Sequence, residues 1–253
     1  MQIEDENGIR TITFDRPEAL NAFTADAAVE LADALAETSP EDHDAVVLTG
    51  EGDAFSAGGD LQAMADRDET ADEAFDRVQA TLGRIVEEAL TARVPIVAKV
   101  NGDAVGAGLA VTAVCDFAYA AESASFSCAF VRVGLVPDTG GTFLLPKLVG
   151  LRTAKQLAFT AEFFSAEEAA EYDLVNEVVP DDELDDAVDE LLETLGKRPT
   201  KTLGLAKRAI HENMGRHWHE ALDHELHTQT LAYGTDEHEE GVRAFLDGEE
   251  PDF

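Results

Sequence analysis

The sequence predicts an α/β fold, because strand patterns alternate with helical patterns along the first part of the chain. The chain has 253 residues, enough for one large domain with an appendage and a substantial core. Hydrophobic residues make up 45% and charged residues 28% of the sequence, which is typical of a globular protein rather than a disordered one.

The first elements follow from periodicity and end signals. Residues 9–14 alternate and are β-branched, which predicts a strand that ends before Pro17. Thr24 is a suitable N-cap for a helix whose apolar residues recur at helical spacing as far as Leu35. Residues 45–50 form a continuous apolar run, which indicates a strand covered on both faces.

Later elements continue the alternation and then become mainly helical after Gly140. The predicted segments are a helix at about 71–91, a buried strand at 95–100, a closely packed helix of small residues at 106–114, short strands at 117–120 and 124–127, and a strand at 174–179.

A boundary is predicted at residues 196–199, where glycine, basic residues and proline occur together. This divides the chain into an α/β core at 1–196 and a helical C-terminal region at 197–253. Three helices are expected in the second part, at 200–213, 218–233 and 236–247. A region of this length cannot build much of a core alone, so we expect it to pack on the body or on another subunit.

The charge balance excludes two classes of partner. There are 53 acidic and 18 basic residues, which gives a net charge of -35. Nucleic acids and anionic membranes are bound through Lys and Arg, so neither is expected as a partner. Such a surface repels itself at low salt and is relieved at molar salt, where the Debye length falls to roughly 3 Å. The charge therefore predicts the cytoplasm of a high-salt, halophilic cell.

Other features agree with an intracellular protein. Cys115 and Cys128 are expected to be free thiols in a reducing compartment. The first residues lack the basic and apolar regions of a signal peptide. The longest apolar run, at 104–115, is shorter than the roughly 20 residues that a membrane helix needs.

Several common sites are not predicted. Gly102, Gly106 and Gly108 resemble part of a dinucleotide fingerprint, but Val111 stands where its third small residue belongs. No Walker loop and no G-x-S-x-G motif occur. Among solvated residues of the C-terminal region lie His211, His217, His219, His224 and His227, and surface roles explain these side chains better than a metal site.

Two glycine-rich turns offer a different chemistry. One covers residues 55–61 after a buried strand, and the other covers residues 100–108 before the small-residue helix. If the two turns face each other, two main-chain N–H groups converge on one oxygen and form an oxyanion hole. The alternative is that the glycines only permit tight turns.

The motifs in these turns, with four others, resemble the crotonase (enoyl-CoA hydratase/isomerase) superfamily over essentially the whole chain. The matching segments are residues 16–22 (RPEALNA), 55–61 (FSAGGDL), 100–108 (VNGDAVGAG), 115–116 (CD), 134–142 (GLVPDTGGT) and 240–246 (EGVRAFL).

The resemblance implies a spiral of ββα units, a C-terminal helical region used in trimerisation, and acyl-CoA thioester substrates with no separate cofactor. It implies a homotrimer or a dimer of trimers. The oxyanion donors carry over to the N–H groups of Ala57 and Ala107. The residues expected to line the substrate site are Ala57, Gly58, Gly59, Asp60, Leu61, Gly106, Ala110 and Phe130.

This chain departs from the hydratases of the family at two positions. Their two catalytic glutamates correspond to Ala110 and Phe130 here, and neither side chain can transfer a proton. Ordinary hydration is therefore not expected. The two side chains would instead belong to an apolar wall around the acyl group.

One carboxylate, Asp138, follows Pro137 at a place where isomerases of the family carry an acidic residue. The segment most resembles the ring-1,2-epoxyphenylacetyl-CoA isomerases, and it implies a single catalytic acid/base. From the residues alone, Asp138 could equally be a turn residue or the N-cap of a helix near Gly140. We therefore expect an enoyl-CoA or epoxyacyl-CoA isomerase. The alternatives are an enoyl-CoA hydratase and a non-catalytic acyl-CoA-binding subunit.

Overall fold

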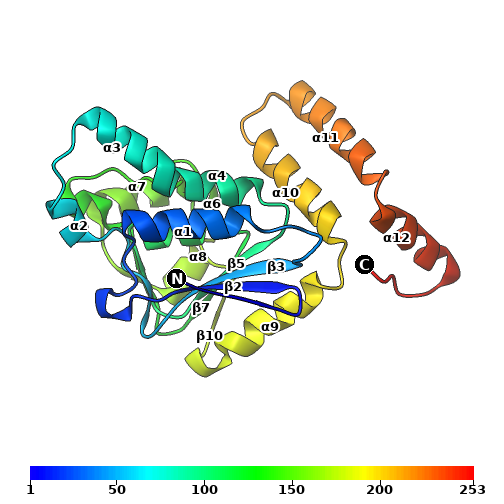
Figure 1. The fold of residues 1–253 in the computed structure, drawn as a ribbon, viewed down its shortest axis with the longest axis horizontal. Helices are drawn as coiled ribbons and strands as arrows, with labels where there is room; N and C mark the ends of the chain where they lie inside the picture. The colour runs from blue at the N-terminus through cyan, green and yellow to red at the C-terminus, as the bar shows by residue number, and fades with distance from the viewer.

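The centre of the protein is a six-stranded sheet, seen edge-on among helices in Figure 1. The computed structural model describes residues 1–253. The strands lie in the order β1-β2-β3-β5-β7-β10, and only the β1–β2 pair is antiparallel. They are β1 (Gln2–Glu6), β2 (Ile9–Phe14), β3 (Ala45–Gly50), β5 (Ile96–Val100), β7 (Phe117–Ala121) and β10 (Glu177–Val179).

A second sheet has four short strands in the order β4-β6-β8-β9. They are β4 (Ala54–Ser56), β6 (Asp103–Val105), β8 (Ser125–Ser127) and β9 (Phe164–Ser165). In three successive cases a strand of the large sheet is followed by a strand of the small one: β3 by β4, β5 by β6 and β7 by β8. Helical turns follow each pair. The expected spiral of ββα units is therefore visible in the topology.

Helices cover the large sheet on both faces. The helices are η1 (Pro17–Ala19), α1 (Ala25–Ala36), α2 (Leu61–Ala65), α3 (Ala71–Val78), the π-helical turn η2 (Gln79–Gly83), α4 (Arg84–Thr91), α5 (Ala107–Val114), η3 (Ala129–Val133), α6 (Leu145–Leu148), α7 (Gly150–Thr160), α8 (Ala166–Glu171), η4 (Asp181–Glu183), α9 (Leu184–Leu195), α10 (Thr200–Asn213), α11 (Trp218–Ala232) and α12 (Asp236–Asp247).

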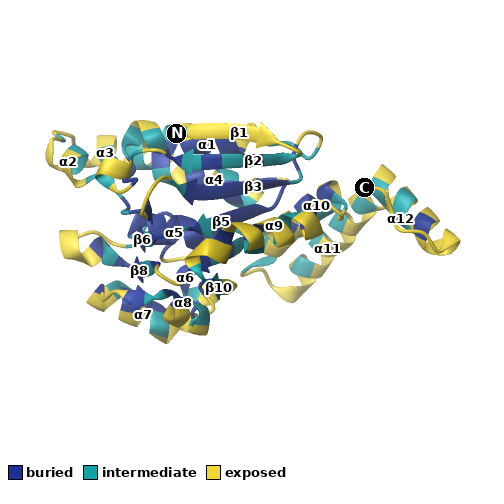
Figure 2. Ribbon diagram, turned by 90° about the horizontal axis from the view of Figure 1, so that it is seen from below, coloured by how far each residue is buried: buried dark blue, intermediate teal, exposed yellow.

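Strand β3 shows why the sheet is buried on both sides. Val46 and Leu48 belong to the main core with α1 and α4. Val47, which points the other way, packs in a smaller cluster with Leu184 and Val188 of α9. The prediction of a strand covered on both faces is confirmed, and Figure 2 shows β3 in the colour of buried residues.

In the C-terminal region, helix α10 packs on the body, and helices α11 and α12 extend away from it. Helix α10 is fastened to the body by Lys207, whose Nζ lies 2.6 Å from Asp116 Oδ2 and donates to the Val94 carbonyl at 3.3 Å. Both side chains of this ion pair are largely buried. Helix α11 packs along α10, and α12 lies beyond it, away from the sheets (Figure 1). The prediction that this region packs on the body is therefore right for α10.

The structure differs from the sequence predictions mainly in its short and exposed elements. Strand β1 was not predicted, because all five of its residues are exposed and its polar sequence shows no alternation. Strands β4 and β6 have three residues each, too few for a periodic signal. The predicted helix at 71–91 is one helical run that the π turn at Gln79–Gly83 interrupts. None of the helices combines the length and apolar composition that a bilayer crossing requires.

Candidate active site

The two glycine-rich turns face each other because the strands before them are neighbours. Strands β4 and β6 pair in parallel, so the segments that leave their carboxyl ends meet at one edge of the small sheet. A Cβ atom on Gly58 would lie 3.0 Å from the nitrogen of Ala107 and 2.5 Å from the carbonyl oxygen of Val105. Gly58 also has a φ of +86°, which side-chain-bearing residues rarely adopt. Only glycine allows this close approach.

From Ala57 to Asp60, each main-chain N–H group donates a hydrogen bond within the protein, with one exception. Ala57 donates to the Leu20 carbonyl at 2.8 Å, and Asp60 donates to the Phe23 carbonyl at 3.0 Å. Gly58 donates to the hydroxyl of Ser56 at 3.2 Å. The N–H of Gly59 has no acceptor in the protein. Gly59 is only partly buried, so this donor is open to water or to a ligand.

This pattern corrects the prediction that Ala57 supplies the first oxyanion donor. Its N–H is already bonded, and the unpaired donor is two residues further on, at Gly59. The bond depends on Leu20 and Asn21, two consecutive residues in the left-handed region with φ of 49° and 57°. They come from a distant part of the chain, so the local sequence of the turn contained no signal for the difference.

The second predicted donor, Ala107, is the first residue of α5. An N–H at this position has no partner inside its own helix, and the positive end of the helix dipole adds to its attraction for negative charge. Gly106, directly before it, has φ of 56° and ψ of -116°, a conformation open to glycine. Gly59 and Ala107 are therefore two donors on adjoining main-chain segments.

Asp60 and Leu61, which close the first turn, have structural partners. The Asp60 carboxylate accepts from the N–H of Ala63 at 3.0 Å and caps α2, and it forms an ion pair with Arg16 at 2.9 Å. The N–H of Ala63, followed by the Arg16 guanidinium, holds the pKa of Asp60 below its usual value. This carboxylate is fixed as an anion that shapes the turn. Leu61 is exposed.

Asp138 lies in a turn between η3 and α6. Its carbonyl accepts from the N–H of Gly141 at 2.7 Å, and its Oδ1 accepts from the Thr139 hydroxyl at 3.0 Å. Thr139 has a left-handed φ of 50°. Because the next helix begins only at Leu145, Asp138 is a turn residue and not a helix N-cap.

The Asp138 carboxyl is partly removed from water. Burial raises its pKa above the usual aspartate value, against the opposing effects of the Thr139 hydroxyl and, more weakly, the charge of Arg77. Arg77 belongs to α3 and is held by Glu69 through contacts of 2.6 and 2.9 Å. The turn also lies against α5, because a Cβ on Gly140 would be 3.3 Å from Val114 Cγ2. A raised pKa makes the carboxylate a stronger base than that of an ordinary aspartate.

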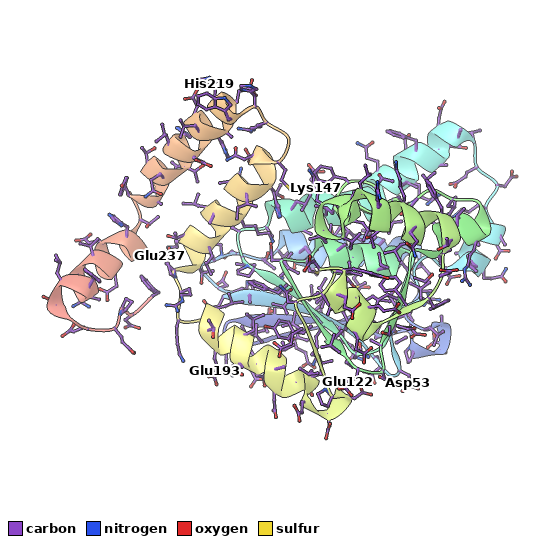
Figure 3. The ribbon with its side chains drawn as sticks, turned by 180° about the vertical axis from the view of Figure 1, so that it is seen from behind. Asp53, Glu122, Lys147, Glu193, His219 and Glu237 are labelled. Atoms are coloured by element: carbon purple, nitrogen blue, oxygen red, sulfur yellow. The ribbon has the colours of Figure 1, made fainter.

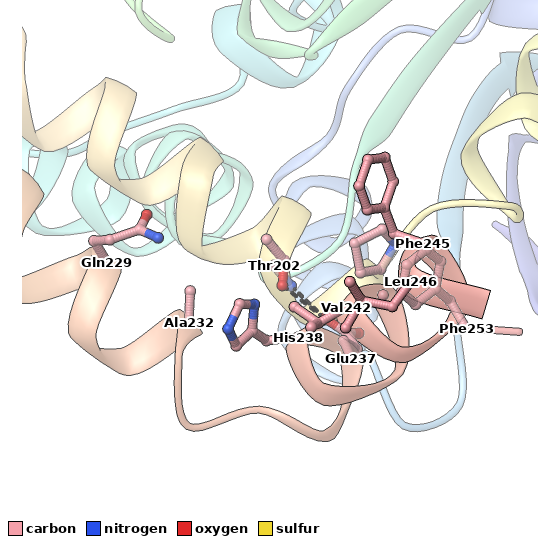
Figure 4. Close-up of a pocket in the computed structure, with 11 residues that line it drawn as sticks. Thr202, Gln229, Ala232, Glu237, His238, Val242, Phe245, Leu246 and Phe253 are labelled. Carbon is pink, nitrogen blue, oxygen red and sulfur yellow. Dashed lines mark hydrogen bonds between the residues drawn. The ribbon is translucent and has the colours of Figure 1, made fainter. Parts of the chain in front are cut away.

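Ala110 and Phe130 lie inside the main core. Their exposed fractions are 0% and 7%, so in the single chain they do not form an open wall. One cavity, of about 440 Å³, lies between the body and α10 and includes Val114, Leu144 and Lys207 in its lining. Another, of about 480 Å³, is formed by the C-terminal helices (Figure 4). Neither cavity is lined by Gly59, Ala107 or Asp138.

Other reactive side chains lie apart or are inert. Both cysteines are free thiols, and burial raises the pKa of Cys128 to about 11 and that of Cys115 further still, which disfavours thiolate chemistry. His219 is at the tip of α11, far from the sheets (Figure 3), and stacks on Trp218. No group of three His, Cys, Asp or Glu side chains is arranged to hold a metal ion.

Comparisons with known proteins agree over the whole chain. A family model described as enoyl-CoA hydratase/isomerase matches residues 4–253. The chain is 36% identical over 250 residues to the 1,2-epoxyphenylacetyl-CoA isomerase of Escherichia coli (strain K12), covering 98% of this chain and 95% of that protein. It is 33% identical over 255 residues to the crotonyl-CoA hydratase of Syntrophomonas wolfei subsp. wolfei (strain DSM 2245B / Goettingen), covering 99% and 96%.

The fold agrees as well. A crystal structure of an enoyl-CoA hydratase from Bacillus anthracis superposes with a TM-score of 0.91 at 30% identity, covering 100% of this chain and 98% of that one. The predicted crotonase-like fold class is thereby confirmed.

We predict that Gly58→Ala damages the fold more than Gly215→Ala. Both glycines have nearly the same left-handed φ, +86° and +87°, but only Gly58 has main-chain atoms where a Cβ would stand. Gly215→Ala should lower the free energy of unfolding by roughly 1–2 kcal/mol, the usual cost of that conformation. Gly58→Ala should lower it by roughly 1–3 kcal/mol more, because the added methyl group overpacks the contact.

Urea unfolding of both variants at the same salt concentration measures this difference. Equal losses of stability would show that the two turns do not meet as closely as the structure places them.

Proposed function

Because the chain belongs to the enoyl-CoA hydratase/isomerase family, we propose that it isomerises an unsaturated or ring-epoxide acyl-CoA through a thioester enolate. The observation that carries the proposal is Asp138, a partly buried carboxyl with a raised pKa, in a chain that has no glutamate at either hydratase position. Identity of 36% to an epoxyphenylacetyl-CoA isomerase supports the same reaction class.

The proposed oxyanion hole consists of the N–H groups of Gly59 and Ala107. Two donors on the thioester oxygen lower the free energy of the enolate more than that of the ground state, because the negative charge develops on that oxygen. The loss of one such donor costs about 10²- to 10³-fold in rate in other enzymes. The free N–H of Gly59 and the helix-terminal N–H of Ala107 support this assignment.

Asp138 is the proposed base and acid. For a 3-enoyl-CoA, its carboxylate removes a proton from C2, and the electron pair moves into a dienolate whose negative charge is on the thioester oxygen. The protonated carboxyl then returns the proton to C4, and the double bond lies between C2 and C3. One carboxyl is sufficient because no proton is gained or lost overall.

Hydration is the less favoured reaction. It requires one group to activate water and another to protonate the α-carbon. Ala110 and Phe130 can do neither, and their apolar side chains would keep water from the intermediate. Hydratases are nevertheless among the similar proteins, so the assay below includes hydration as an outcome.

We also propose that the C-terminal helices assemble the chain into a trimer or a dimer of trimers. Large apolar side chains are exposed along α11 and α12, among them Leu226, Phe245 and Leu246. The accessible surface of 13259 Å² exceeds by about 2,400 Å² the value expected for a compact monomer of 27.2 kDa. Apolar area of this kind on projecting helices is typical of an interface.

The proposed setting is the cytoplasm of a cell with a high salt concentration. The net charge of -35 is spread over the accessible surface at about one charge per 380 Å². Coenzyme A enters as part of the substrate, and no separate cofactor is required by the proposed reaction.

We predict that Asp138→Asn abolishes isomerisation of a 3-enoyl-CoA while leaving the fold and acyl-CoA binding intact. The amide cannot accept the proton, so kcat should fall by at least about 10³-fold. Asp173→Asn is the matched control, because Asp173 is an exposed turn aspartate outside the site, and it should keep the wild-type rate. Product analysis after incubation with a 3-enoyl-CoA and, separately, with crotonyl-CoA measures both reactions.

Three results would contradict this assignment. Full isomerisation by Asp138→Asn would remove Asp138 from the mechanism. Hydration of crotonyl-CoA by the wild type without isomerisation would favour the hydratase. Binding of acyl-CoA with no turnover of any thioester would favour the non-catalytic subunit.

The acid limb of the pH profile should depend on Arg77. Activity needs the Asp138 carboxylate, so kcat/KM should fall as the pH drops through its pKa, which burial raises. The Arg77 charge opposes that rise. Arg77→Gln should therefore move the acid limb to higher pH, whereas Arg84→Gln, which removes an arginine paired with Asp33, should leave it in place. Profiles that coincide for all three proteins would rule out this influence of Arg77.

Salt should stabilise the chain by screening its self-repulsion. We expect the thermal unfolding midpoint to rise between about 0.1 M and about 2 M potassium chloride, because the Debye length falls from about 10 Å to about 3 Å or less. Sucrose at matched osmolality is the control, since it does not screen charge. A midpoint that rises equally in both solutions, or in neither, would contradict the proposed high-salt setting.

A further inference from the structure

Ser56, the last residue of β4, is completely buried directly before the turn that contains Gly59. Its hydroxyl donates to the Asn21 carbonyl at 2.8 Å and accepts from the N–H of Gly58 at 3.2 Å. The hydroxyl therefore joins two main-chain segments that are far apart in sequence. A buried hydroxyl with both bonds made holds its neighbours in one arrangement.

The segment that Ser56 binds is itself rigid. Leu20 and Asn21 are consecutive left-handed residues, and their carbonyls accept from the Ala57 N–H and the Ser56 hydroxyl respectively. The Asn21 side chain donates to the carbonyls of Glu51 at 2.9 Å and Ala54 at 2.7 Å. The two carbonyls are thus fixed relative to β4.

Phe23 holds the other side of the turn. Its N–H donates to the Gly58 carbonyl at 2.6 Å, and its carbonyl accepts from the N–H of Asp60 at 3.0 Å. These two bonds lie on either side of Gly59 and leave the N–H of Gly59 pointing away from Phe23. With Ser56 on Gly58, every donor from Ala57 to Asp60 has a partner except that of Gly59.

We propose that Ser56 is a positioning residue that aims the N–H of Gly59 at the thioester oxygen, by holding the Gly58 N–H and the Asn21 carbonyl at once. This inference rests on the proposed oxyanion hole. In this proposal the buried Ser56 side chain does not touch the substrate. It sets the orientation of one of the two donors, the N–H of Gly59.

The physical reason is the freedom of glycine. Without the hydroxyl, the Gly58 N–H and the Asn21 carbonyl lose their partners, and buried groups in that state reorient to find others. Two adjacent glycines offer little resistance to rotation of the intervening peptide, which carries the Gly59 N–H and would then be held only by the bond from the Phe23 N–H to the Gly58 carbonyl. The substrate would still bind through its CoA portion, but its carbonyl would be polarised less.

The test measures polarisation directly in Ser56→Ala. Cinnamoyl-CoA is the probe, because its conjugated carbonyl absorbs at longer wavelength when hydrogen bonds draw charge onto the oxygen, and it has no C4 proton to shift. We expect Ser56→Ala to lose more than half of the absorbance shift seen on binding to the wild type. Its kcat for a 3-enoyl-CoA should fall by about tenfold or more, with the Kd of the probe changed less than about threefold.

Ser127→Ala is the matched control, since Ser127 is equally buried in the small sheet and donates to the Ala161 carbonyl at 3.1 Å. It should lose stability to a similar extent and keep the full shift. Should Ser56→Ala fail to fold, Ser56→Cys preserves the volume with a poor hydrogen-bonding group and takes its place.

The outcomes separate the two proposals. A full shift and full kcat in the Ser56 variant, or equal losses in the Ser127 variant, would overturn the positioning role while leaving the oxyanion hole standing. No shift on binding to the wild type would overturn the oxyanion hole itself, and the role of Ser56 with it.

Discussion

The candidate site depends on one close contact, the packing of Gly58 against the nitrogen of Ala107. The parallel pairing of β4 with β6 creates it, because it delivers two turns to the same edge of the small sheet. A side chain at Gly58 would separate the turns and with them the two donors of the proposed oxyanion hole, Gly59 and Ala107. The left-handed turn at Leu20 and Asn21 and the buried Ser56 hydroxyl then fix which N–H remains free.

The charge on Asp138 depends on opposing effects. Burial favours its protonated form, while the Thr139 hydroxyl and Arg77 favour the carboxylate. The proposed role, in which Asp138 first takes a proton and then returns it, calls for a pKa above that of an ordinary aspartate, and burial shifts the pKa in that direction. Glu69 holds Arg77 by two short contacts. Through Arg77, helix α3 therefore influences the pKa of Asp138.

In this acidic chain few cationic side chains are buried, and Lys207 is one of them. Lys207 of α10 pairs with Asp116, which lies between α5 and β7, and so links the C-terminal region to the body. Beyond α10, helices α11 and α12 expose apolar side chains. The rest of the surface is acidic, so two copies of the chain repel each other there. Assembly through α11 and α12 would remove apolar area from water, and screening by salt would reduce the repulsion between the acidic surfaces.

The α/β class, the buried strand β3, the Thr24 cap, the three C-terminal helices and both glycine turns were all determined by local pattern, because periodicity and end signals act over a few residues. Tertiary structure alone decided that Gly59 rather than Ala57 has the free donor, that Asp138 is no helix cap, and that Ala110 lies inside the core. Each of these depends on what a distant segment contributes. A main-chain N–H is occupied or free only with respect to a carbonyl brought to it by the fold, and a carboxyl is buried only by side chains that its own neighbours in sequence do not reveal.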